Sequence, residues 1–217
     1  MVRTLVLKEL RESLPIMAIA TLVIGYVLTA IFWGFKLFGT ILQGVDQMPF
    51  VADGFAYKIV WIGGVFAAVL ALKQTQWEEM KGTYRYLLYR PVDRQQFFLL
   101  KITVGLLIVA LMMAAMIVAY GVWAAMPGRH ASPFFWSMTV PSWQGWSVLP
   151  VIYAAAFLSG IRPARWFGSK LLPLAGGAVV AFFLMVQPWP WIAWVGSALF
   201  TALYVSCAIE VAQSRDY

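Results

Sequence analysis

The chain has 217 residues, of which 62% are hydrophobic and only 12% are charged, and its mean hydropathy is +0.79. This composition excludes an ordinary soluble protein and predicts an integral membrane protein. The net charge of +7 does not indicate nucleic-acid binding. The basic residues lie in short loops beside apolar runs, where they contact anionic membrane lipid and set the orientation of the chain.

The first 14 residues have an amphipathic pattern. Val2, Val6, Leu10 and Leu14 are spaced four apart, and charged residues lie toward the other side. This spacing predicts an interfacial helix over 1–14 that lies along the inner membrane surface. Pro15 then begins the first span, because the first turn of a helix needs no amide hydrogen there. The apolar run that follows is too long for a secretory signal peptide and has no cleavage pattern after it.

Six apolar runs are candidates for membrane spans, each of which needs about 20 residues. Two of them, 55–72 and 146–161, are short and contain glycine or proline, so hydropathy alone leaves them open. The six runs are 15–35, 55–72, 102–126, 146–161, 171–187 and 191–209.

The positions of the basic residues favour six crossings. With the N-terminus inside, six crossings leave only Lys36, Lys58 and Arg129 of the 16 Lys and Arg residues on the outer side. If run 55–72 did not cross, the basic cluster in 73–101 would face outward, against the positive-inside rule. We therefore predict an all-α integral membrane protein with six transmembrane helices and both termini in the cytoplasm. Residues 1–217 form a single transmembrane domain.

The two longer outer loops, 36–54 and 127–145, are too short to form a folded domain. Trp136, Trp143 and Trp146 are predicted to anchor the second loop at the level of the lipid headgroups. The sequence QPWP between the last two runs predicts a tight outer hairpin. Small residues such as Ser159-Gly160 predict close helix packing.

Groups that carry catalysis or ion transport are missing from the predicted spans. No charged residue or histidine lies well inside a run, whereas ion-coupled carriers use such residues. His130 is the only histidine and has no second ligand nearby, so no metal site is expected. Ser159 and His130 are predicted on opposite sides of the membrane, which disfavours a serine protease. The single cysteine, Cys207, excludes an internal disulfide.

The chain also has no Gly-rich loop that ends in Gly-Lys-Ser/Thr, so it is not expected to bind ATP phosphates. We therefore predict no catalytic, cofactor-binding or metal-binding residue in this chain. It is not expected to be an enzyme.

The most polar stretch, EEMKGTYRYLLYRPVDRQQFFLLK, covers 78–101. Apolar side chains there follow one helix face, which predicts a short amphipathic helix on the inner surface. Gly82 weakens this helix by about 1 kcal/mol relative to alanine. Pro91 ends it, and Asp93 is a suitable N-cap for the third span. The residues of the apolar face are Trp77, Met80, Tyr84, Leu87 and Leu88.

This stretch resembles the pattern E..GT...LL..PV.R......K of ABC-2 type permeases, which lies between their second and third spans. The residues that match are Glu79, Gly82-Thr83, Leu87-Leu88, Pro91-Val92, Arg94 and Lys101. The N-terminal LVLKELRES resembles the opening segment of the same family. The resemblance implies an exporter of the bacterial cytoplasmic membrane. It is built from two permease subunits, identical or different, and two ATPase subunits that bind ATP and Mg.

The resemblance further implies that residues 77–94 form a coupling region that docks in a groove of the ATPase. Glu78 and Glu79 would pair with basic groups there, and Gly82-Thr83 would permit close backbone contact. Tyr84 and the two leucines would fill the apolar groove or hold the helix to the membrane. The three arginines would contact the partner or lipid phosphate. The implied coupling residues are Trp77, Glu78, Glu79, Gly82, Thr83, Tyr84, Arg85, Leu87, Leu88, Arg90, Pro91 and Arg94.

A different class of function stays open at this point. The chain is either a transport subunit, or a non-transporting membrane scaffold or ion-coupled carrier. Spans without charged groups disfavour the carrier, but they do not disfavour the scaffold. The sequence identifies no substrate-binding residues, because no group of polar side chains marks a cavity.

Overall fold

The computed structural model describes residues 2–33, 48–50, 54–77, 94–128, 133–164 and 166–214. Within these ranges every regular element is a helix, so the all-α prediction is confirmed for the part described. The elements are α1 (Val2–Trp33), α2 (Phe55–Leu72), the π-helical turn η1 (Lys73–Trp77), α5 (Arg94–Ala125), the 3-10 turn η2 (Trp136–Thr139), α6 (Val140–Ser147), α7 (Leu149–Ile161), α8 (Phe167–Lys170), α9 (Leu172–Met185) and α10 (Pro190–Ser214).

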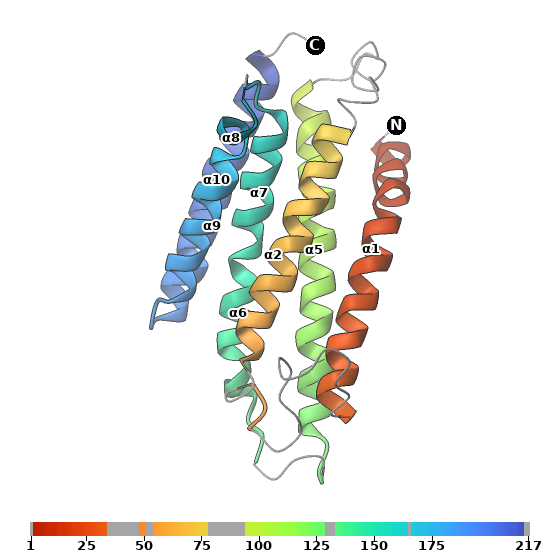
Figure 1. The fold of residues 1–217 in the computed structure, drawn as a ribbon, viewed down its shortest axis with the longest axis vertical. Coiled ribbons are helices and arrows are strands. Elements are labelled where there is room, and N and C mark those ends of the chain that lie inside the picture. Colours follow the sequence, from red (N-terminus) through yellow and green to blue (C-terminus); the bar gives the residue numbers. More distant parts are fainter. Residues whose placement is uncertain are drawn as a thin grey trace.

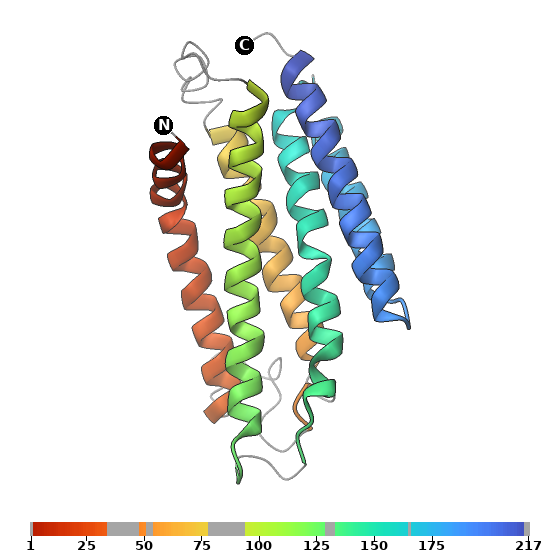
Figure 2. The same cartoon turned by 180° about the vertical axis from the view of Figure 1, so that it is seen from behind.

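The long helices lie side by side in an elongated bundle and alternate in direction along the chain (Figure 1). At one end α1 begins, η1 ends and α5 begins, and there too α7 ends, α9 begins and α10 ends. We call this the N-terminal end of the bundle. Seen from behind, α1 lies against α5, and α10 lies beside α7 (Figure 2).

Within the described ranges, five helical segments are long and apolar enough to cross a membrane. They are Arg3–Trp33, Phe55–Trp77, Gln95–Ala125, Trp136–Ile161 and Pro190–Ser214. The remaining apolar helix, α9, has 14 residues. It is therefore about 21 Å long, which is shorter than the roughly 30 Å of the hydrocarbon layer. Each of the six predicted apolar runs is helical over most of its described residues, while six crossings with both termini inside stay a prediction.

The N-terminal segment differs from the sequence prediction. Helix α1 continues through Pro15 as one helix, with no separate element over 1–14. Figure 1 shows the first turns of α1, in dark red, inclined to the rest, as a proline inside a helix favours. In these first turns Glu9 and Ser13 are buried against the bundle, while Leu10 and Leu14 are exposed. Part of the polar side therefore faces protein, while Arg11 and Glu12 are exposed. An amphipathic pattern alone cannot distinguish a polar residue that faces protein from one that faces water.

The region predicted as the second outer loop also differs. It is helical from Trp136 onward, and η2, α6 and α7 follow one another as far as Ile161. Its polar residues suggested a loop, yet Ser142, Gln144 and Ser147 are buried. Two of these side chains, Gln144 and Ser147, form hydrogen bonds inside the bundle. For example, the Ser147 hydroxyl donates to the Gln144 carbonyl at 2.7 Å.

Helix α7 is the centre of the bundle. All but one of its 13 residues are buried, and it packs against α2, α9 and α10. Small residues permit the close approach: a Cβ at Gly177 of α9 would overlap the Cβ of Ala155, and a Cβ at Gly63 of α2 would overlap Leu149. The prediction that small residues serve helix packing is confirmed at these positions.

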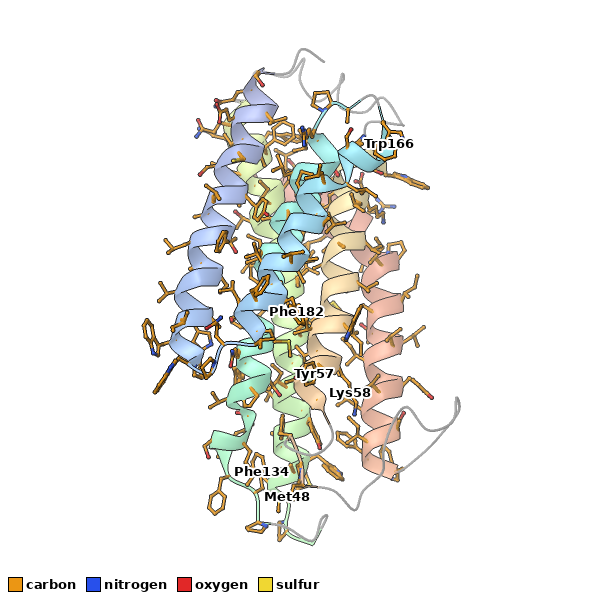
Figure 3. The ribbon with its side chains drawn as sticks, turned by 60° about the vertical axis from the view of Figure 1, so that its left-hand side comes forward. Met48, Tyr57, Lys58, Phe134, Trp166 and Phe182 are labelled. Atoms are coloured by element: carbon orange, nitrogen blue, oxygen red, sulfur yellow. The ribbon has the colours of Figure 1, made fainter. Side chains whose placement is uncertain are left out.

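Aromatic side chains close the other end of the bundle, where Figure 3 shows Met48 and Phe134, with Trp166 at the N-terminal end. The ring of Tyr120 stacks on Phe50 with centroids 4.3 Å apart, and Phe55 lies 4.6 Å from the same ring. Phe50 is buried and has a φ of 64°. A side chain in this left-handed conformation is unfavourable unless packing holds it. The aromatic contacts therefore fix segment 48–50 against α2 and α5.

Candidate functional site: a buried ion pair beside the predicted coupling region

Two described elements border the predicted coupling segment. η1 ends at Trp77 and α5 begins at Arg94, both at the N-terminal end of the bundle (Figure 1). The side chain of Trp77 is 52% exposed. The other ten predicted coupling residues lie outside the described residues, so their helix and their contacts stay predictions. They are Glu78, Glu79, Gly82, Thr83, Tyr84, Arg85, Leu87, Leu88, Arg90 and Pro91.

The five residues of η1 continue α2 with a wider, π-helical turn. Such turns are rare and frequently occur at functional sites. Here the turn places Gln74 and Thr75 in the interior of the bundle. The Thr75 hydroxyl donates to the carbonyl of Ala71 at 2.9 Å, and its side chain fills the space above Gly160 of α7. The polar side chains of η1 therefore point into protein just before the coupling segment.

A buried ion pair lies directly beside η1. Glu9 of α1 is 1% exposed and Lys101 of α5 is 0% exposed. The Lys101 Nζ lies 3.4 Å from Glu9 Oε1 and donates a 2.9 Å hydrogen bond to the backbone carbonyl of Gln74. Among the residues that the structure describes, these two are the only charged side chains in the fully buried class.

Two further hydrogen bonds extend the pair across the bundle. The Gln74 side-chain amide donates to Glu9 Oε2 at 3.4 Å, and the Tyr153 hydroxyl of α7 donates to Gln74 Oε1 at 2.5 Å. Tyr153 is completely buried. We call Glu9, Gln74, Lys101 and Tyr153 the buried polar cluster. Each of its members comes from a different element, so the cluster links α1, η1, α5 and α7.

The electrostatics of the cluster explain why both charges occur together. An isolated charge in an apolar interior is very unfavourable, whereas a charge with an opposite partner and hydrogen bonds is tolerated. The ammonium group of Lys101 has three protons to donate, and it meets the Glu9 carboxylate and the Gln74 carbonyl. The Phe97 ring also lies close to this ammonium group, with its centroid 5.5 Å from Lys101 Nζ.

A second contact joins η1 to α1 closer to the surface. The Lys73 Nζ donates a hydrogen bond to the backbone carbonyl of Glu12. The Glu12 side chain in turn pairs with Lys8 one turn earlier, at 3.6 Å, with the two side chains 47% and 30% exposed. Unlike the pair in the cluster, the Lys8–Glu12 pair faces the surroundings of the protein.

Sequence reasoning did not find the cluster. It placed Lys101 just before a span beginning at 102 and put the charges of 1–14 on the membrane surface. The structure places Lys101 two turns inside α5 and Glu9 two turns inside α1. A signal was present, because both residues belong to the two segments that resemble ABC-2 permeases. What the sequence lacks is the spatial position that brings segments 92 residues apart into contact.

Ser159, the other candidate considered from the sequence, has a packing role. Its side chain is completely buried, and its hydroxyl accepts a hydrogen bond from the backbone amide of Leu174 at 2.9 Å. This contact joins α7 to the first turn of α9. Across the described ranges, no group of three or more His, Cys, Asp or Glu side chains is placed to hold a metal ion.

Apolar grooves lie on the outside of the bundle, and among the described residues no charged side chain lines the three reported below. One, of about 360 Å³, separates α2 from α9 and is bordered by Tyr57, Trp61 and Phe182. Figure 3 shows Tyr57 and Lys58 in the first turns of α2, with Phe182 on α9. A groove of about 400 Å³ lies between α1 and α2, and one of about 650 Å³ lies between α6, α7 and α10. Their linings are typical of surfaces that contact apolar molecules.

Comparison with known protein families identifies a match. The family model described as "ABC-2 family transporter protein" matches residues 6–187. This range includes Glu9, η1, the whole predicted coupling region and Lys101. Searches of the curated proteins and of the solved structures each find no significant match.

Proposed function

Because the chain belongs to the ABC-2 family of transporter proteins, we propose that it is the permease subunit of an ATP-driven exporter in the bacterial cytoplasmic membrane. Two permease subunits, identical or different, form the translocation path. Two separate ATPase subunits bind ATP and Mg and supply the energy. The observation that carries this proposal is the family match, which covers 6–187 and therefore the entire region expected to contact the ATPase.

In the proposed mechanism, residues 77–94 are the part of the permease that the ATPase holds. ATP binding and hydrolysis change the ATPase, and the coupling region follows that change. The permease switches state only if the nucleotide-bound ATPase binds one permease conformation more tightly than the other. The apolar grooves beside α2 support a path for a substrate with apolar surface, because the groove walls are almost entirely carbon.

Substitutions in the coupling region test this proposal. We expect Gly82→Trp to block close backbone contact, and the double reversal Glu78→Lys with Glu79→Lys to repel basic groups on the ATPase. Both variants should lose the ATPase subunit in a pull-down from detergent-solubilised membranes. Glu210→Lys is the matched control, because Glu210 is an exposed carboxylate on α10 outside the coupling region. If every variant retains the ATPase at the level of the control, residues 77–94 do not carry the contact.

One observation bears on the alternative of an ion-coupled carrier. Glu9 and Lys101 are buried charges of the kind that carriers use. However, they pair with each other two turns from the ends of their helices, whereas carrier sites lie near the middle of the membrane. Transport that vanadate abolishes and a protonophore leaves unchanged is expected for the exporter, and the reverse is expected for a carrier.

A further inference from the structure

The buried polar cluster includes one residue close to each end of the predicted coupling segment. Gln74 is three residues before Trp77, where η1 ends, and Lys101 is seven residues after Arg94, where α5 begins. The hydrogen bond from Lys101 to the Gln74 carbonyl joins these two elements directly. The two described elements that border the segment, η1 and α5, are therefore joined to each other.

The same cluster also fastens both ends to helices that are remote in the sequence. Glu9 attaches them to α1, and Tyr153 attaches them to α7, the central helix of the bundle. Lys73 adds a second contact from η1 to the backbone of α1. If η1 or the start of α5 moves, these contacts require α1 and α7 either to move with it or to oppose the movement.

Stability alone does not account for a buried ion pair at this place. Apolar side chains of similar volume usually stabilise an interior as well as a buried ion pair does, or better. Ion pairs and side-chain amides, in contrast, impose a specific geometry, because their hydrogen bonds are directional. Gly105 of α5 lies close to the polar side chains of the cluster. A Cβ at this position would overlap the Tyr153 hydroxyl and lie 2.7 Å from Gln74 Oε1. The backbone of α5 thus leaves space for the cluster.

We propose that Glu9 and Lys101 are positioning residues that hold the two ends of the coupling segment in register with α1 and α7, so that movement of the ATPase reaches the whole bundle. This inference rests on the proposed function, since it gives the cluster a role in ATP-driven switching. Glu9 and Lys101 do not contact the ATPase in this account. They act through η1 and the first turns of α5.

The test removes both charges at once. The double variant Glu9→Gln, Lys101→Met is expected to fold, because removing both partners of a buried pair leaves no isolated charge. The permease and its ATPase are purified as a complex and reconstituted in vesicles of phosphatidylethanolamine and phosphatidylglycerol. Three quantities are measured: the folded amount by size-exclusion chromatography, the amount of ATPase bound, and vanadate-sensitive ATP hydrolysis relative to the ATPase alone.

We expect the double variant to fold and to retain the ATPase, while the permease-dependent change in ATP hydrolysis falls about fivefold or more. The matched control is Lys8→Met, Glu12→Gln, which removes a surface pair of the same residue types within α1. It should behave like the unmodified chain.

Unchanged ATP hydrolysis in the folded double variant would overturn the proposal and leave the proposed function intact. Loss of the bound ATPase together with hydrolysis would overturn it as well, because a positioning role predicts a complex that is bound but poorly coupled. If the double variant does not fold, Tyr153→Phe replaces it in the same measurements, since this change keeps both charges and removes one hydroxyl. If Tyr153→Phe then shows the same permease-dependent change in ATP hydrolysis as the unmodified chain, the proposal is refuted. If the unmodified chain binds no ATPase, the proposed function itself fails.

Discussion

The hydroxyl of Ser159 in α7 accepts a hydrogen bond from the backbone amide of Leu174, in the first turn of α9. The amide groups of a first helical turn have no partner within their own helix. At the far end of α9, the side-chain amide of Gln144 donates to the carbonyls of Leu184, Met185 and Gln187, at 2.9 to 3.2 Å. Both ends of this short helix are therefore satisfied by side chains of α6 and α7.

Replacing Ser159 with alanine should lower the free energy of unfolding by about 1 kcal/mol, because the Leu174 amide loses its partner in an apolar environment. Thermal unfolding in detergent measures the effect. Ser206→Ala is the control, since the Ser206 hydroxyl is exposed and bonds only to a carbonyl one turn earlier in α10. Equal unfolding temperatures for the two variants would show that Ser159 does not stabilise α9.

Gln144→Leu should be more destabilising, by about 1–3 kcal/mol, because three carbonyl groups share the donor that is removed. Gln144→Glu should be at least as damaging, since an ionised carboxylate only accepts hydrogen bonds and would face three carbonyl oxygens. The control is Gln187→Leu, whose side chain makes an exposed bond to the Phe183 carbonyl. A Gln144→Glu variant as stable as the unmodified chain would contradict the assignment.

Gly105→Ala should destabilise the protein, although alanine normally stabilises a helix relative to glycine by about 1 kcal/mol. The reason is steric, because the new Cβ would overlap the Tyr153 hydroxyl and displace it from Gln74. Gly25 of α1 has no atom within 4 Å of the corresponding position. Gly25→Ala should therefore leave stability unchanged or raise it. Unfolding curves that shift in the same direction for both variants would refute this contrast.

Phe50 combines an unfavourable backbone conformation with aromatic packing, and two substitutions separate the effects. Phe50→Ala loses the stacking on Tyr120 and retains a φ of 64° on a residue with a Cβ. Phe50→Gly loses the same packing but adopts that φ without strain. The glycine variant should be more stable than the alanine variant by about 1–2 kcal/mol. An alanine variant as stable as the glycine variant would show that the backbone at 50 is unstrained.

The sequence predicted the helical class, the family and the approximate position of every long helix, because membrane helices must contain long apolar runs. Run 55–72 coincides with α2 to the residue. The predicted helix bounds were less accurate where polar residues are buried. Ser142 and Gln144 suggested a loop, and Glu9 and Lys101 suggested a surface, since a sequence pattern does not tell whether a polar group faces water or another helix.

The candidate site shows the same limit. The conspicuous polar stretch directed attention to residues 78–94, which the family resemblance explains. The buried polar cluster needed spatial information, since Glu9, Gln74, Lys101 and Tyr153 are spread over 145 residues of the sequence. Only Lys101 belongs to the quoted coupling pattern, and there it marked the end of the pattern. Glu9 belongs to the N-terminal segment that resembles the family, whereas Gln74 and Tyr153 are common residue types that belong to neither segment.

The orientation of the bundle can be tested with two engineered cysteines in a Cys207→Ser background. Gly82→Cys places a thiol in the predicted coupling segment, and Pro188→Cys places one in the turn between α9 and α10, at opposite ends in the proposed topology. A membrane-impermeant maleimide added to intact cells should label Pro188→Cys and leave Gly82→Cys unlabelled until the membrane is permeabilised. Labelling of Gly82→Cys in intact cells would place the coupling segment outside, where no ATP-hydrolysing subunit can reach it, because ATP is inside the cell. Labelling of neither position before permeabilisation, and of both after it, would instead show that run 171–187 does not cross.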